Sequence, residues 1–170
     1  ILKNVLENDE IPAITTPYFN FFELDVLCQM GKLTEVLDKI RSYWGGMLDL
    51  GAVTFWEEYD PSVPKEEQYD MYGDHFGKSL CHAWAASPIY FLAKYFAGLD
   101  LVNKDGVTYV LKPQMQYFTD LDCALPVGNQ GSVHLIWDGE YLEVISDVDG
   151  GVLELGKERI PLIKGKVRRS

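Results

Sequence analysis

Hydrophobic residues in the first half of the chain recur at helical spacing. Thr16-Pro17 is a typical helix start, because the hydroxyl can cap the first turn and a proline needs no N–H there. The apolar stripe that follows is Phe19, Phe22, Val26 and Met30. With further apolar residues beside the stripe, the pattern predicts a helix that is covered on most sides and ends at Gly31.

A second and a third helical region are predicted further along. Residues 33–44 predict a helix with one apolar and one charged face. Gly45-Gly46 is expected to end this helix. Because the link to the first helix is short, the two helices are expected to form an antiparallel hairpin. Residues 78–97 also favour a helix. Pro88 interrupts it, so that either the helix kinks or a new one starts with Ser87 as its cap. The part after Pro88 is apolar nearly all round, which predicts burial between neighbours.

Residues 45–77 form the longest stretch without a clear period. Glycine, proline, acidic and aromatic residues mix here, and the stretch exceeds the roughly 12–15 residues beyond which a loop is usually functional. Residues 53–59 favour an extended backbone. Residues 63–74 are polar and predict a surface excursion.

Beyond a boundary at residues 98–106 the hydrophobic period becomes two. Strands are predicted at residues 107–111, 133–137, 141–145 and 152–155, with Asp138-Gly139 as a type I′ hairpin turn. The basic residues between 164 and 169 are expected to form a solvated, frayed tail. The predicted fold class is therefore α followed by β, with a helical domain at residues 1–98 and a small antiparallel β-sandwich at residues 99–170.

Composition excludes several classes of protein. The 170 residues are 47% hydrophobic and 13% aromatic, which is too apolar for a disordered chain. The net charge of −11 disfavours nucleic acid as a partner. No apolar run reaches the roughly 18 residues of a membrane span. Cys28, Cys81 and Cys123 lie far apart, so we expect buried thiols and neither a disulfide framework nor a zinc site.

The segment from Trp56 to Asp60 holds three carboxylates between aromatic residues. Carboxylates transfer protons and aromatic rings stack on sugars, and a glycosidase needs both. In an extended segment the side chains of Glu57 and Glu58 point to opposite faces, so the two cannot serve one pocket. The alternative from the residues alone is a solvated acidic loop.

His82 lies near the predicted start of the third helix, with Ser79 on the same face. It is either a satisfied structural histidine or a donor to a ligand hydroxyl. The tryptophans are either core residues or sugar platforms: Trp44, Trp56 and Trp84. Neither His75 nor His134 has metal-ligand spacing with His82.

Three long segments resemble a known family. They are TPYFNFFELDVLCQMG, IRSYWGGMLDLGAVTFWEEYDP and YGDHFGKSLCHAWAASPIYFLAKYFAGL. They resemble the last helices of the bacterial α-L-rhamnosidases of glycoside hydrolase family 78, and the similarity runs roughly over residues 15–99. The region after Leu99 is similar to the C-terminal β-sandwich of that family in position and pattern.

The resemblance implies a six-hairpin (α/α)6 barrel and a reaction. The family hydrolyses terminal α-L-rhamnosyl groups of glycosides or polysaccharides with inversion, without a metal or organic cofactor. Its base is the glutamate of a T-x-W-E motif, which falls on Thr54-Phe55-Trp56-Glu57, so the resemblance makes Glu57 the general base. A histidine that contacts the sugar is matched by His82. Trp56 and Trp84 are the further substrate-binding candidates.

Two interpretations of the chain's function follow. The family's acidic cluster with the general acid has no match here, and an inverting pair needs two carboxyls roughly 6.5–9.5 Å apart. The first interpretation is the C-terminal part of a rhamnosidase, which carries the base and packs against an upstream remainder of the catalytic domain. The alternative is a non-catalytic fragment that binds carbohydrate or only packs.

Overall fold

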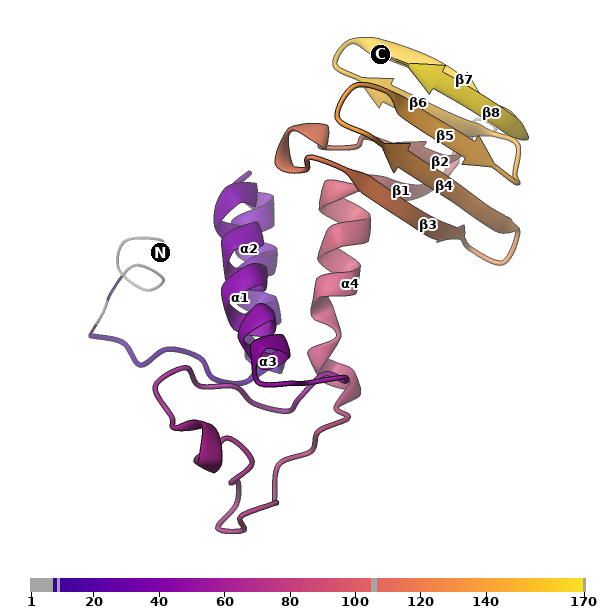
Figure 1. Cartoon of the computed structure of the whole chain (residues 1–170). Helices are drawn as coiled ribbons and strands as arrows, with labels where there is room; N and C mark the ends of the chain where they lie inside the picture. The colour runs from indigo at the N-terminus through magenta and orange to yellow at the C-terminus, as the bar shows by residue number, and fades with distance from the viewer. Residues whose placement is uncertain (1–7, 9, 105–106, 170) are drawn as a thin grey trace. The chain divides into compact units, whose positions relative to one another are not determined.

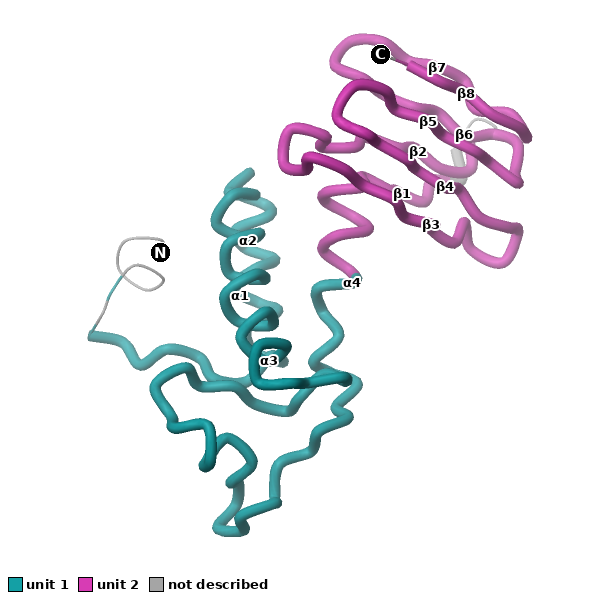
Figure 2. The backbone as a smooth tube through the Cα atoms, viewed as in Figure 1, with its two compact units in different colours: residues 1–89 teal, residues 90–170 magenta. Residues whose placement is uncertain are grey.

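The computed structural model describes residue 8, residues 10–104 and residues 107–169. The chain divides into two compact units, Ile1–Ile89 and Tyr90–Ser170 (Figure 2). Helices come first and eight strands follow, as the α-then-β prediction states (Figure 1). The division falls after Ile89, inside a helix, and not after residue 98 as the change of period suggested.

Helix α1 spans Pro17–Gln29 and ends as predicted. Gly31 has a φ of 73°, its N–H donates to Cys28 O, and the Lys32 N–H donates to Leu27 O. These two bonds form a Schellman motif, in which a residue without Cβ adopts the left-handed conformation and satisfies the last carbonyls.

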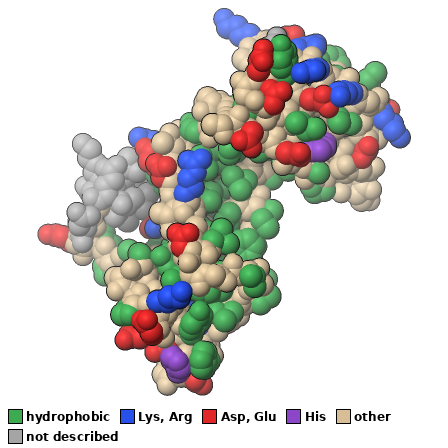
Figure 3. All heavy atoms as spheres, in the orientation of Figure 1, with side chains coloured by type: hydrophobic (Ala, Val, Ile, Leu, Met, Phe, Trp, Pro, Cys, Tyr) green, Lys and Arg blue, Asp and Glu red, His purple; other side chains and the backbone are tan. Residues whose placement is uncertain are grey.

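Within this chain α1 buries one face. Asn20, Leu24 and Cys28 are buried at intervals of four residues. The predicted stripe is exposed: Phe19 (56%), Phe22 (51%), Val26 (38%) and Met30 (50%). Hydrophobic side chains are accordingly visible on the surface of this unit (Figure 3). The apolar residues lie nearly all round the helix, so periodicity alone does not select the face that this chain buries.

The second helical segment continues through the glycine pair that was expected to end it. Helix α2 (Leu33–Lys39) runs into a π-helical turn (Ile40–Trp44) and then into α3 (Gly45–Asp49). The helix ends at Gly51, where a second Schellman pair joins Gly51 N–H to Leu48 O and Ala52 N–H to Met47 O.

Packing explains the glycine inside the helix. A Cβ on Gly46 would lie 2.3 Å from the phenol oxygen of Tyr59, whereas a Cβ on Gly45 would meet nothing within 4 Å. Gly46 therefore lets the Tyr59 ring approach the helix backbone, a requirement that local sequence does not reveal.

The third helical region is shorter than predicted. Residues 78–82 are not helical, Ala83–Ala85 form a single 3-10 turn, and α4 spans Ser87–Phe91 before a π-helical segment, Leu92–Phe96. A new helix thus starts at Ser87-Pro88, the second of the two predicted alternatives. Within this chain Phe91 and Phe96 are buried, whereas Ile89 is 62% exposed.

The second unit contains two four-stranded sheets. One has the order β1 (Leu99–Lys104), β2 (Val107–Leu111), β6 (Gly151–Leu155), β7 (Glu158–Leu162). The other has the order β3 (Leu121–Val127), β4 (Gly131–Trp137), β5 (Leu142–Ser146), β8 (Gly165–Arg169). All pairs are antiparallel except β2 with β6, which is parallel. The predicted sandwich is thus mostly, not wholly, antiparallel.

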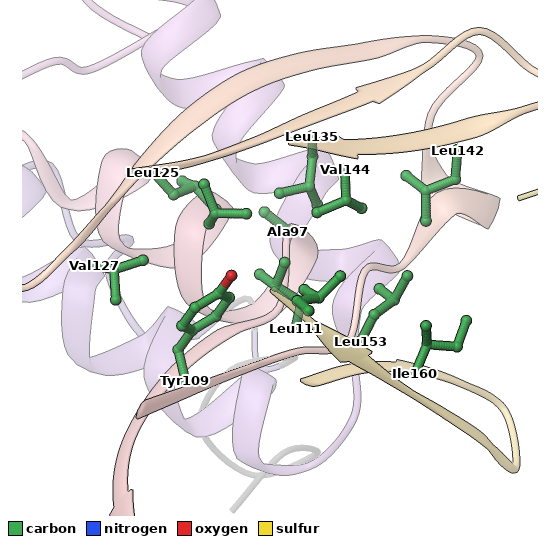
Figure 4. Packing of buried hydrophobic residues seen from close by; sticks show 12 residues of the cluster. Ala97, Tyr109, Leu111, Leu125, Val127, Leu135, Leu142, Val144, Leu153 and Ile160 are labelled. Carbon is green, nitrogen blue, oxygen red and sulfur yellow. The ribbon is translucent and has the colours of Figure 1, made fainter. Parts of the chain in front are cut away.

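Alternate residues of both sheets form one hydrophobic core (Figure 4). Tyr109 and Leu111 on β2 lie in the same cluster as Leu135 on β4 and Val144 on β5, and all four are at most 1% exposed. The Tyr109 hydroxyl hydrogen-bonds Ser146 Oγ at 2.6 Å. The strands were predicted from apolar residues at every second position, and these are the positions that are buried.

Two local predictions for this unit were wrong. The basic tail is strand β8, in which Lys166 Nζ lies 2.6 Å from Glu143 Oε2 and Arg168 lies 4.4 Å from the Tyr141 ring centroid. Strands β4 and β5 do form a hairpin, but Trp137 pairs with Leu142 across a four-residue loop. Asp138 accepts bonds from the N–H groups of residues 140 and 141, a side-chain turn in place of type I′.

The thiols also differ from expectation. Cys28 is buried, Cys123 is half-buried and Cys81 is exposed, and each is a reduced thiol in the described structure. Among the described residues no helix is long and apolar enough to cross a membrane.

The pair Gly45-Gly46 gives a test of the packing between the Tyr59 ring and the helix backbone. Gly46→Ala should destabilise the helical unit by about 1–3 kcal/mol, because the new methyl overlaps the Tyr59 ring. Gly45→Ala, the matched control, should stabilise it by about 0.5–1 kcal/mol through helix propensity. Urea unfolding followed by circular dichroism at 222 nm measures both; equal effects from the two variants would contradict the packing argument.

Candidate functional site

Two segments outside the helices and strands, residues 54–57 and 79–82, are joined by hydrogen bonds in the first unit and carry the predicted site. The Glu57 N–H donates to Ser79 O at 2.9 Å, and the His82 N–H donates to Phe55 O at 2.8 Å. The Thr54 hydroxyl adds a bond to Leu80 O. These bonds join residues about 25 positions apart in the sequence, and they engage backbone groups of residues 79, 80 and 82, where the chain is not helical.

Both carboxylate oxygens of Glu57 accept hydrogen bonds. Oε1 accepts from the Tyr72 hydroxyl at 2.8 Å, and Oε2 accepts from the Ser79 N–H at 3.0 Å. Glu57 is half-buried. The donors come from two different parts of the chain, so the plane of the carboxylate is fixed at two points.

The surroundings favour the ionised form of Glu57. The Ser79 N–H bond is the largest cause of its lowered pKa, followed by the Tyr72 hydroxyl, with smaller contributions from the charges of His82 and Lys78. Partial burial opposes them. Hydrogen bonds to the charged form lower the pKa of a carboxyl, so Glu57 is a carboxylate at neutral pH.

Glu58 faces the other way, as the extended backbone predicted. Its Oε1 accepts from the Thr15 hydroxyl at 2.7 Å, and its Oε2 lies 4.0 Å from Lys78 Nζ. Glu58 thereby ties the chain before α1 to the long loop. The two adjacent glutamates have no partner atom in common.

Lys78 forms the polar centre of the long loop. Its side chain is 3% exposed, and its ammonium donates to Gln68 O. The Gln68 amide in turn donates to Asp60 O at 2.6 Å and Val63 O at 2.8 Å. Burial lowers the pKa of Lys78, and the carboxylates nearby, Glu58 first, oppose this. A buried cation therefore orders a loop that has little regular structure.

Trp56 is a core residue of this loop. It is 3% exposed and meets the Tyr69 ring edge-on at 5.6 Å, while Tyr69 stacks on Phe76 at 6.1 Å. Trp44 is buried as well, and its indole N–H donates to Ala85 O at 2.8 Å. Of the three candidate platforms, these two lie inside the fold.

Trp84 is the exposed tryptophan of the three. It is 69% exposed, lies 5.2 Å from the Tyr18 ring and meets His82 edge-on at 5.9 Å. His82 is half-buried, and its imidazole has no hydrogen-bond partner in the part of the chain that the structure describes. His82 precedes the 3-10 turn and has an extended backbone. Ser79 and His82 were expected to share a helical face, and they do not.

Sequence reasoning missed Tyr72, the side-chain donor to Glu57. The residue is 79% exposed and lies in the segment predicted as a polar surface excursion. A tyrosine followed by glycine between two polar stretches is a weak turn signal, and nothing in that signal indicates a partner 15 residues earlier.

The other carboxylates near this segment have local roles. Asp60 accepts from the Ser62 N–H at 2.8 Å and from its hydroxyl at 2.6 Å, and Asp74 accepts from the Phe76 N–H at 3.2 Å. Over residues 8, 10–104 and 107–169 no group of His, Cys, Asp and Glu side chains could hold a metal ion. Chemically, the arrangement is an oriented carboxylate beside an imidazole and an exposed indole.

No family model matches the chain, and no curated protein is significantly similar to it.

The buried lysine gives a test of how the loop is held. Lys78→Met keeps the bulk of the side chain but leaves Gln68 O without its donor, so we expect a loss of about 1–3 kcal/mol in unfolding free energy. Limited proteolysis within residues 60–74 should also become faster. Lys65→Met, a change at an exposed position of the same loop, is the control and should alter neither. Equal protease resistance of both variants would contradict the role of Lys78.

Proposed function

We propose that this chain is part of an inverting α-L-rhamnosidase and that Glu57 is its general base. The observation that supports this most directly is the carboxylate of Glu57, held by Tyr72 and Ser79 in the position of the T-x-W-E motif. A base must be ionised at working pH and fixed within reach of a water molecule. The lowered pKa of Glu57 meets the first condition, and the two hydrogen bonds fix its orientation.

The neighbouring side chains take distinct roles in this proposal. His82, with an imidazole that lacks a hydrogen-bond partner among the described residues, donates to a hydroxyl of the sugar. Trp84 offers an exposed ring for the apolar face of the pyranose. Trp56, the third substrate-binding candidate, is buried and packs against Tyr69, and it thereby supports the loop that carries Glu57.

The general acid lies outside this chain in the proposal. Within this segment Glu58, Asp60 and Asp74 each accept the hydrogen bonds described above. In the reaction Glu57 takes a proton from water, the water oxygen attacks the anomeric carbon, and a second carboxyl protonates the leaving oxygen. The exposed apolar side chains of α1 support further helices of the catalytic domain as the packing partner.

The two glutamates give the test of the base. In the longer protein that contains this chain, Glu57→Gln should lower kcat on an aryl α-L-rhamnoside by at least about 10²-fold, because the amide cannot take a proton. Glu58→Gln keeps an acceptor for Thr15 and should retain most of the activity. A damaging Glu58→Gln beside a nearly silent Glu57→Gln would exclude the assignment. Absence of turnover in the unmodified protein, together with binding of rhamnosides, would favour the non-catalytic alternative.

His82 gives a second test. His82→Ala should weaken transition-state binding by about 1–3 kcal/mol, seen as a lower kcat/KM, since it removes a hydrogen bond to the sugar. His75→Ala is the matched control, because His75 is exposed and its imidazole contacts Asp70 in the same loop. If kcat/KM is the same in His82→Ala as in the parent protein, His82 is a structural residue only.

A further inference from the structure

Tyr72 adopts a backbone conformation that its residue type disfavours. With Gly73 it forms a two-residue turn between Met71 and Asp74, whose N–H and C=O groups exchange hydrogen bonds of 3.0 Å. The φ angles of Tyr72 and Gly73 are 55° and 81°. Among the described residues Tyr72 is the one non-glycine residue with positive φ. Turns of this kind favour asparagine, aspartate or glycine at both central positions.

Packing does not account for a tyrosine at this turn. The residue is 79% exposed, so burial of the ring contributes little to hold it there. The conformation instead places the Tyr72 hydroxyl within hydrogen-bond distance of Glu57, to whose Oε1 it donates at 2.8 Å. A shorter side chain such as asparagine, although better suited to the turn, could not span to that carboxylate from the same backbone position.

We propose that Tyr72 is a positioning residue for Glu57, held in a strained turn so that its hydroxyl and the Ser79 N–H clamp the two carboxylate oxygens. Its catalytic consequence rests on the proposed role of Glu57 as base, whereas the clamp itself does not. The Ser79 N–H comes from the segment paired with residues 55–57, and the Tyr72 hydroxyl comes from the tip of the long loop. The carboxylate can therefore keep its plane only while both elements stay in place.

The hydrogen bond between Tyr72 and Glu57 also shifts the pKa of both groups. The hydrogen bond from Tyr72 is the second largest cause of the lowered pKa of Glu57. The same bond is the largest cause of the raised pKa of Tyr72, since an ionised phenol could not donate to the carboxylate. The groups that face Glu57 with charge are His82 and Lys78, and both also favour the carboxylate.

Two substitutions at Tyr72 separate the hydroxyl from the turn. In the 170-residue chain, Tyr72→Phe removes the hydroxyl and keeps the strain, whereas Tyr72→Asn removes the hydroxyl and relieves the strain. We expect the pKa of Glu57, followed by carboxyl ¹³C NMR against pH, to rise in both variants. We expect Tyr72→Asn to have a higher Tm than Tyr72→Phe, because asparagine tolerates positive φ. Tyr141→Phe removes a phenol hydroxyl in the other unit and should leave the pKa of Glu57 unchanged.

Two results in the 170-residue chain would overturn the clamp. An unchanged pKa of Glu57 in Tyr72→Phe overturns the clamp, and so does a Tm of Tyr72→Asn no higher than that of Tyr72→Phe. In the longer protein, Tyr72→Phe should lower kcat by up to about 10²-fold with little change in KM. The acid limb of the kcat/KM profile should move to higher pH, because a base with a higher pKa ionises later as pH rises.

Failure of the positioning role and failure of the proposed function give different results. If Glu57→Gln abolishes turnover while Tyr72→Phe leaves both kcat and the acid limb unchanged, Tyr72 has no positioning role. If Glu57→Gln is itself silent, the proposed function fails, and the pKa response of Glu57 to Tyr72→Phe still decides whether the clamp exists.

Discussion

The backbone hydrogen bonds between residues 55–57 and 79–82 are the interaction on which the candidate site depends. They bring Glu57 next to the Ser79 N–H and place His82 close enough for its charge to act on the carboxylate. Without this pairing the two segments would be separate parts of a long loop. The pairing satisfies backbone groups that would otherwise need water, and it is also what keeps residues 78–82 from becoming helical.

The loop that separates these two segments is held by polar contacts more than by a hydrophobic core. Lys78 is buried at its centre and donates to Gln68 O, and the Gln68 side chain bonds two further carbonyls. Trp56 and Tyr69 add an aromatic contact. Buried polar groups require partners, and Lys78 Nζ and the Gln68 amide nitrogen find theirs on backbone carbonyls of the loop, which ties its strands of backbone together.

The two units differ in how their apolar side chains are used. In the β unit, alternate residues of both sheets form one buried core. In the helical unit, α1 buries Asn20, Leu24 and Cys28 while several of its large apolar side chains are exposed. An exposed apolar surface of this kind is typical of a protein interaction surface. It agrees with a helical unit that forms part of a larger catalytic domain in the proposed function.

The sequence by itself determined the features that depend on neighbouring residues. Gly31 ends α1, Pro88 interrupts the third helical region, strand periods mark β2, β4, β5 and β6, and Glu57 and Glu58 face opposite ways. The tertiary structure alone decided the rest. Gly46 lies within a helix where the Tyr59 ring needs its space. Residues 78–82 are not helical, because residues 55–57 bond to their backbone. Residues 165–169 are a strand because they pair with the edge of β5. Tyr72 belongs to the same group, since its partner is 15 residues away and only the folded loop brings the two together. Local patterns report the conformation that a segment favours in isolation, and these four cases are set by partners distant in sequence, whose hydrogen bonds and packing outweigh local preference.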